Sequence, residues 1–103
     1  ISVTTNLEDS ISKQTDVIYT DSWPCDQEIE VIEKLFLPYQ IKKAHLERMN
    51  QKGFFLPCPP VTRDKEVSAE TLKMNLCKDY EAKEFLLHSQ NAILEHLVNE
   101  NCM

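Results

Sequence analysis

The sequence has a single glycine, Gly53, in 103 residues. Antiparallel β-proteins need many tight turns, and those turns use glycine where the backbone takes a positive φ. The shortage of glycine therefore argues against an all-β fold and favours a few long helices. A G-x-S-x-G motif is missing too, so the chain lacks a turn that commonly supports a serine nucleophile. We expect no enzymatic activity and nominate no catalytic residue.

Basic residues are also in short supply, because 11 of them stand against 17 acidic residues and the net charge is −6. An acidic surface repels nucleic-acid phosphates and anionic lipids. Apolar runs stay well short of the roughly 18 residues that a membrane-spanning helix needs. We therefore expect neither a nucleic-acid partner nor a membrane.

Metal-binding patterns are missing as well, since no C-x-x-C or H-E-x-x-H motif occurs. Glu84, His88 and His96 fall near one face of a predicted helix, but the two histidines are two turns apart and too distant to share a metal ion by themselves. We interpret these histidines as solvated or hydrogen-bonded groups. The sequence thus predicts no metal site and no cofactor.

Helical periodicity is what the sequence does contain. Apolar residues at three- and four-residue steps predict a helix over about 79–100, which has the strongest pattern in the chain. Pro38 either kinks a helix or begins a new one, and Gly53 is expected as a left-handed C-cap. Weaker patterns predict further helices over about 7–19, from Asp26 onward, up to Gly53, and over about 68–77. The predicted fold is all-α, a bundle of four to five helices in a single domain spanning residues 1–103, with the last helix at its centre.

The aromatic segment that begins at Phe54 is the exception to the helical pattern. Prolines follow at positions 57, 59 and 60, so the segment is expected to run extended or as polyproline II. Phe54, Phe55 and Leu56 either close one end of the core or form an exposed anchor for a partner.

Four cysteines, an even number, favour a disulfide framework over a metal site. The chain begins at Ile1, which suits a mature secreted protein from which a signal peptide has been removed. A continuous helix over 79–100 would hold Cys77 and Cys102 too far apart to bond. Two pairings remain open: Cys25–Cys102 with Cys58–Cys77, which we prefer because its second loop is short, and Cys25–Cys77 with Cys58–Cys102.

Small size, helices, acidity and cysteines together resemble the small helical salivary proteins of blood-feeding insects and, less closely, short-chain helical cytokines. The resemblance implies a secreted, extracellular, monomeric effector or inhibitor that binds a protein partner, for example in complement or clotting. Candidate partner-binding residues are Trp23, Lys42, Lys43, Phe54 and Phe55.

A carrier of a small apolar ligand is the alternative, since the chain is also similar in outline to insect odorant-binding proteins and their D7 relatives. The C-x3-C and C-x8-C pairs of those families are absent. The side chains expected to line a ligand cavity are Phe36, Met49, Met74, Phe85 and Leu86.

Overall fold

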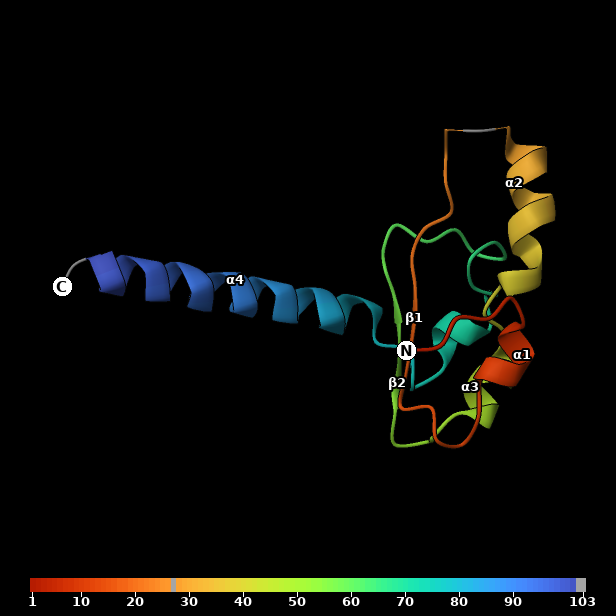
Figure 1. Ribbon diagram of the computed structural model, residues 1–103, viewed down its shortest axis with the longest axis horizontal. Coiled ribbons are helices and arrows are strands. Elements are labelled where there is room, and N and C mark those ends of the chain that lie inside the picture. The colour runs from red at the N-terminus through yellow and green to blue at the C-terminus, as the bar shows by residue number, and fades with distance from the viewer. Residues whose placement is uncertain (27, 102–103) are drawn as a thin grey trace.

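The computed structural model describes residues 1–26 and 28–101. Its centre is a pair of parallel strands, β1 (Val17–Thr20) and β2 (Phe54–Pro57). The register pairs Ile18 with Phe55, and both side chains are buried, whereas their neighbours on the opposite face are exposed or half-buried. Figure 1 shows the two strands side by side in the body of the molecule.

The connection between the strands is a helical crossover, as parallel strands require. It consists of α2 (Ile29–Phe36), a 3₁₀ turn η1 (Leu37–Tyr39) and α3 (Lys43–Arg48). A short helix α1 (Leu7–Ser10) precedes β1. These helices lie on one side of the strands in Figure 1, so they cover one face of the sheet and leave the other open.

The core lies between that covered face and the helices. Phe55, Leu46 and Val67 have no exposed surface, and Met49 is 1% exposed. The remaining buried apolar residues of this cluster are Ile11, Ile18 and Ile41. Because these residues come from the end of α1, both strands, the crossover and the segment after β2, the core joins elements that are distant in the sequence.

The last helix, α4 (Asp79–Asn101), leaves the body on the side of the sheet opposite the other helices (Figure 1). A short 3₁₀ turn, η2 (Thr71–Lys73), precedes it. From Lys83 to Glu100 every α4 residue is exposed, including Phe85 at 69% and Leu94 at 60%. The molecule is consequently elongated, with extents of 55 × 36 × 29 Å.

The predicted all-α fold is therefore wrong, because the described residues contain a parallel βαβ unit. The helix expected over 7–19 ends at Ser10, and its second half becomes β1. Ser12 and Thr15 hydrogen-bond to neighbouring backbone amides, which gives the chain an alternative to helix at this point. The run Val17–Thr20 is rich in β-branched and aromatic side chains, which pack well on a sheet.

Other boundaries also differ from the prediction. Pro38 lies in η1 between two helices, and the following helix stops at Arg48. Gly53 does not have a positive φ, so it is not a left-handed cap. The helix expected over 68–77 is reduced to η2. Helix α4 is long, as predicted, but it is not the centre of a bundle.

The predicted disulfide framework is also corrected. Cys25, Cys58 and Cys77 carry free thiols, so the preferred Cys58–Cys77 bridge is not formed. Burial raises the pKa of the Cys77 thiol to about 11, and this thiol stays protonated at neutral pH. The pairings that involve Cys102 fall outside the described residues. Packing around the βαβ unit, and not covalent bonds among these three residues, holds the fold together.

A polar network fastens α1 to α3. His45 is 3% exposed and accepts the Lys42 amide proton at Nδ1, so its Nε2 carries the proton that it donates to Glu8 Oε1 at 2.6 Å. Arg48 donates to Glu8 Oε2 at 2.6 Å and to the carbonyl oxygens of Glu8 and Ile11. The hydrogen bond from His45, helped by the charge of Arg48, holds the pKa of Glu8 below its ordinary value of 4.5.

We expect the stabilising effect of Glu8 to depend on pH. Because its pKa is lower in the folded chain than in the unfolded one, its contribution is present above pH 4.5 and is lost as the pH falls through the lowered pKa. The difference in unfolding free energy between wild type and Glu8→Gln should therefore become smaller as the pH is lowered below 4.5. Urea denaturation at a series of pH values measures this difference. Glu70→Gln is the control, because Glu70 is exposed and has no side-chain partner among the described residues. The difference in unfolding free energy between wild type and Glu70→Gln should not change with pH. A Glu8 effect independent of pH would contradict the network.

Candidate functional site

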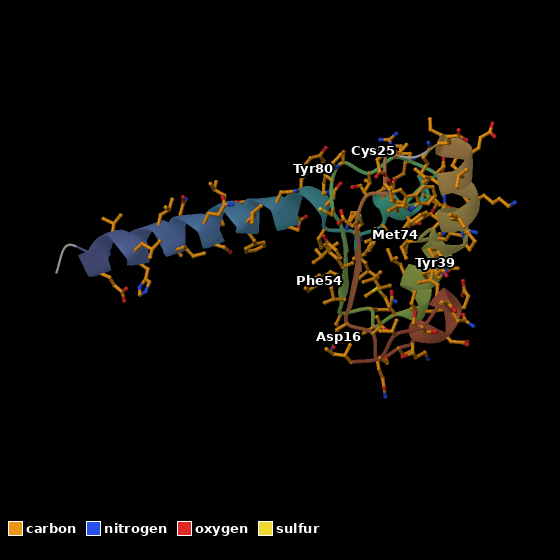
Figure 2. The ribbon with its side chains drawn as sticks, turned by 45° about the horizontal axis from the view of Figure 1, so that its top comes forward. Asp16, Cys25, Tyr39, Phe54, Met74 and Tyr80 are labelled. Carbon is orange, nitrogen blue, oxygen red and sulfur yellow. The ribbon has the colours of Figure 1, made fainter. Side chains whose placement is uncertain are left out.

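The carboxyl ends of β1 and β2 meet at one edge of the sheet, because the strands are parallel. In α/β proteins this edge is where ligands bind, since the loops that follow the strands gather there. Segment 21–26 follows β1 and segment 58–66 follows β2. Figure 2 shows Cys25 at this end of the strands and Asp16 at the opposite end. A ligand site at this edge would therefore lie between these two loops.

A buried carboxylate joins the two loops. Glu66 is 4% exposed, and its Oε1 accepts the backbone N–H of Trp23 at 3.0 Å. Its Oε2 accepts the backbone N–H of Thr62 at 2.8 Å. Among the described residues no cationic side chain lies within ion-pair distance of Glu66. Its negative charge is thus held by backbone donors alone.

A pocket of about 280 Å³ opens beside this carboxylate, between the loops and α2. Trp23 forms one wall and packs against Phe36, with the ring centroids 5.9 Å apart. Lys65 and Glu33 form an ion pair of 3.1 Å that links the loop after β2 to α2. Among the described residues, those that line it are Trp23, Pro24, Cys25, Ile29, Ile32, Glu33, Thr62, Lys65 and Glu66.

Other polar groups stand at the same edge. Tyr19 is exposed near the end of β1, and hydrogen bonding to Cys58, more than desolvation or the negative charge of Asp21, raises the pKa of its phenol. Asp21 accepts the backbone N–H of Ser22 at 2.8 Å, which starts the turn after β1. Cys58 lies directly after β2 and is half-buried. Together these groups give this edge of the sheet a phenol, a thiol and a carboxylate, although none of the three lines the pocket.

The histidines of α4 are remote from this edge. His88 pairs with Glu84 at 3.5 Å and His96 with Glu100 at 3.2 Å, each within one helical turn. Over residues 1–26 and 28–101, no group of three or more His, Cys, Asp or Glu side chains is arranged to hold a metal ion. The helices described in this part of the chain are also too short or too polar to cross a membrane.

The candidate partner-binding residues are dispersed in the structure. Trp23 is half-buried in the pocket wall, and Phe54 is 42% exposed on the open face of the sheet. Phe55 is fully buried and therefore closes the core, which was one of the two interpretations. Lys42 and Lys43 are exposed at the start of α3, where Lys43 pairs with Glu47 at 3.7 Å. Neither lysine lines the pocket that Trp23 lines.

The side chains expected to line an apolar cavity are not brought together either. Met49 belongs to the buried core, and Phe36 packs under Trp23. Phe85 and Leu86 are exposed on α4. Met74 packs against the margin of the core.

Sequence reasoning missed Glu33, Lys65 and Glu66, the charged groups of the pocket. The signal that could have found them is the repeated order of an apolar run followed by a turn, at Val17–Thr20 and at Phe54–Pro57, with helical periodicity in between. That order indicates a βαβ unit, and it directs attention to the segments after each strand.

Three comparisons with known proteins agree on one family. The Asp/Orn binding domain of aspartate/ornithine carbamoyltransferases matches residues 1–97 of the chain. The ornithine carbamoyltransferase of Synechococcus sp. is 33% identical over 90 residues, covering 84% of this chain and 30% of the relative. That of Methanosphaera stadtmanae is 30% identical over 103 residues, covering 97% of this chain and 34% of the relative.

A solved structure agrees with the sequence comparisons. The ornithine carbamoyltransferase from Pyrococcus furiosus superposes with a TM-score of 0.73 at 29% identity, over 84% of this chain and 28% of that one. The chain thus spans about a third of the length of the curated relatives that it matches.

These similarities overturn the functional predictions made from the sequence. Carbamoyltransferases are enzymes, so the predicted non-enzymatic protein is wrong. The resemblance to salivary, cytokine and odorant-binding proteins is wrong for the same reason, together with the secreted location, the effector or inhibitor role and the extracellular protein partner. The composition was misleading, because part of an enzyme can also be acidic and lack a catalytic motif when the site is formed by the ends of loops.

Proposed function

Because the chain belongs to the aspartate/ornithine carbamoyltransferase family, we propose that it forms the amino-acid-binding part of an enzyme that carbamoylates ornithine. The observation that carries the proposal is the pocket at the carboxyl edge of β1 and β2, in a chain that matches a domain named for binding aspartate or ornithine. Ornithine and carbamoyl phosphate take the place of the predicted protein partner. An oligomer takes the place of the predicted monomer, as is typical of this family, and we retain residues 1–103 as one unit within it.

The charge of the pocket favours ornithine over aspartate. Its lining contains two carboxylates, Glu33 and Glu66, and one ammonium group, Lys65, which is already paired with Glu33. One negative charge is left over. Ornithine has two ammonium groups and one carboxylate at neutral pH and is therefore a cation, whereas aspartate is an anion. Opposite charges inside a partly closed pocket attract more strongly than they do in water.

The part of this chain in the reaction is to bind and orient the amino acid. In carbamoyl transfer the side-chain ammonium group of ornithine first gives up one proton, because only the neutral amine has a free electron pair. Its nitrogen then bonds to the carbamoyl carbon of carbamoyl phosphate, the bond from that carbon to the phosphate oxygen breaks so that phosphate leaves, and the nitrogen loses a second proton. A nucleophile fixed against its target reacts far faster than one that diffuses freely. The loops at the edge of the sheet supply this fixation, and the Glu33–Lys65 ion pair links one of them to α2.

Binding can be measured through Trp23, which is the only tryptophan of the chain and lies in the pocket wall. Titrating the 103-residue chain with L-ornithine should change its fluorescence saturably, whereas L-aspartate at the same concentrations should not. Glu33→Gln should weaken ornithine binding by about three- to tenfold, because it removes one of the two negative charges.

Glu30→Gln provides the matched control, since Glu30 is exposed on the same helix and is not part of this pocket. It should leave ornithine affinity unchanged. A saturable response to aspartate without one to ornithine would reverse the substrate assignment. The absence of any ornithine response would refute the proposed site.

A further inference from the structure

The two loops of the site come from strands that are separated by a whole crossover, so something must set the distance between them. Trp23 and Glu66 are 43 positions apart in the chain, yet a backbone donor of one meets the side chain of the other. The second donor to that carboxylate, Thr62, belongs to the loop after β2, of which Glu66 is itself the last residue. Each oxygen of Glu66 therefore serves one loop.

Glu66 is itself firmly anchored. Its carbonyl oxygen accepts the backbone N–H of Ile41 at 3.0 Å, and the next residue, Val67, forms a bridge with Ile41 and is fully buried. Ile41 is 3% exposed and belongs to the core cluster. The carboxylate thus extends from the anchored end of the loop after β2 to the loop after β1 and to the earlier part of its own loop.

We infer that Glu66 is a positioning residue, whose carboxylate fixes the loop after β1 and the loop after β2 at the separation that an amino-acid substrate requires. The inference rests on the proposed function, and it adds to that proposal the group that shapes the pocket. Glu66 acts through Trp23 and through the backbone around Thr62, so the fluorescence of Trp23 and the affinity for ornithine report on it.

Only a carboxylate can perform this role at this position. A carboxylate presents two acceptor oxygens, one for each loop, whereas the amide of glutamine presents one oxygen and one NH₂ group. In Glu66→Gln the NH₂ group would face a backbone N–H, so one loop loses its bond. The lost bond is assisted by charge and lies in a buried place, where such bonds are strongest.

The variant test measures ornithine affinity and stability together. Glu66→Gln should weaken ornithine binding by about tenfold or more, because a displaced loop misplaces the groups that hold the substrate. Glu70→Gln makes the same change of charge four positions away at an exposed site and should leave the affinity unchanged. Urea denaturation of both variants separates loss of binding from loss of folding. Unchanged ornithine affinity in a folded Glu66→Gln chain would overturn the inference.

A second measurement uses the unmodified chain and holds even when the variant does not fold. One carboxylate bonded to two amides predicts that the amide proton resonances of Trp23 and Thr62 shift together in a pH titration, with one common midpoint. The other titratable groups among the described residues that line the pocket are Cys25, Glu33 and Lys65, whereas both amides donate to Glu66. Two different midpoints would refute the joint role of Glu66.

The two proposals fail separately in these experiments. If the wild-type chain does not respond to ornithine but the two amides titrate together, the link between the loops stands and the proposed substrate fails. If ornithine binds and the amides titrate apart, the proposed function stands and the role of Glu66 fails.

Discussion

Replacing Phe55 by alanine should lower the free energy of unfolding by about 3–5 kcal/mol. The side chain has no exposed surface and packs in the core opposite Ile18, the residue with which it pairs on β1. Removing the ring leaves a cavity that the rigid sheet cannot fill, so lost burial and lost packing add. The midpoint of urea denaturation at constant slope gives the change.

Phe54 is the matched control for this experiment. It is the same residue type, one position earlier in β2, but it lies on the opposite face of the strand and is 42% exposed. Phe54→Ala should cost no more than about 1 kcal/mol, since surface substitutions away from special features have small effects. Equal losses for the two variants would mean that the assignment of the buried face is wrong.

Gly53→Ala should also be strongly destabilising, by about 3 kcal/mol. An added Cβ would lie 2.1 Å from the backbone oxygen of Asp16, far inside contact distance. That oxygen accepts the N–H of Phe54 at 2.9 Å, so moving it away breaks the hydrogen bond at the start of the parallel strand pair. The clashing atom belongs to the backbone and not to the flexible end of a side chain, so it cannot move away easily.

The expected loss of stability in Gly53→Ala is informative because replacing glycine by alanine often has the opposite effect. At a position where alanine fits, replacing glycine stabilises a protein, because the unfolded chain loses freedom. Gly53 does not have a positive φ, so its backbone conformation alone would accept alanine. Lys52→Ala, at the exposed neighbouring position, should leave the urea midpoint almost unchanged. A Gly53→Ala chain as stable as wild type would show that Asp16 does not approach this closely.

The sequence was informative for segments whose secondary structure depends on their own residues and not on a distant partner. The periodicity over 79–100 correctly predicted a long helix, and the prolines after Phe54 correctly predicted an extended segment. Val17–Thr20 was misassigned because a run of four apolar and β-branched residues fits a helix or a strand, and only its pairing with β2 decides. The shortage of glycine argues against antiparallel hairpins, but a parallel pair joined by a helical crossover does not need them.

The site could not be predicted in the same way, because it depends on contacts between distant residues. Glu66 looks like one of many surface acids until the fold brings Trp23 to it. The cysteines suggested bonds among themselves, whereas Cys58 lies at the end of a strand beside Tyr19 and Cys77 beside Phe55. Only the tertiary arrangement gives these residues their roles.

The way in which α4 is attached has a mechanical consequence. Phe55 in the middle of β2 donates its N–H to Leu76 and accepts the N–H of Lys78, and α4 starts at the very next residue. A helix of 23 residues is about 35 Å long, so a tilt of about 5° at this pivot moves its far tip by about 3 Å. The helix α4 thus pivots on β2, the strand that leads into the loop beside the pocket. A partner that binds the outer half of α4 would therefore also restrain the position of Cys58 and of the loop after β2.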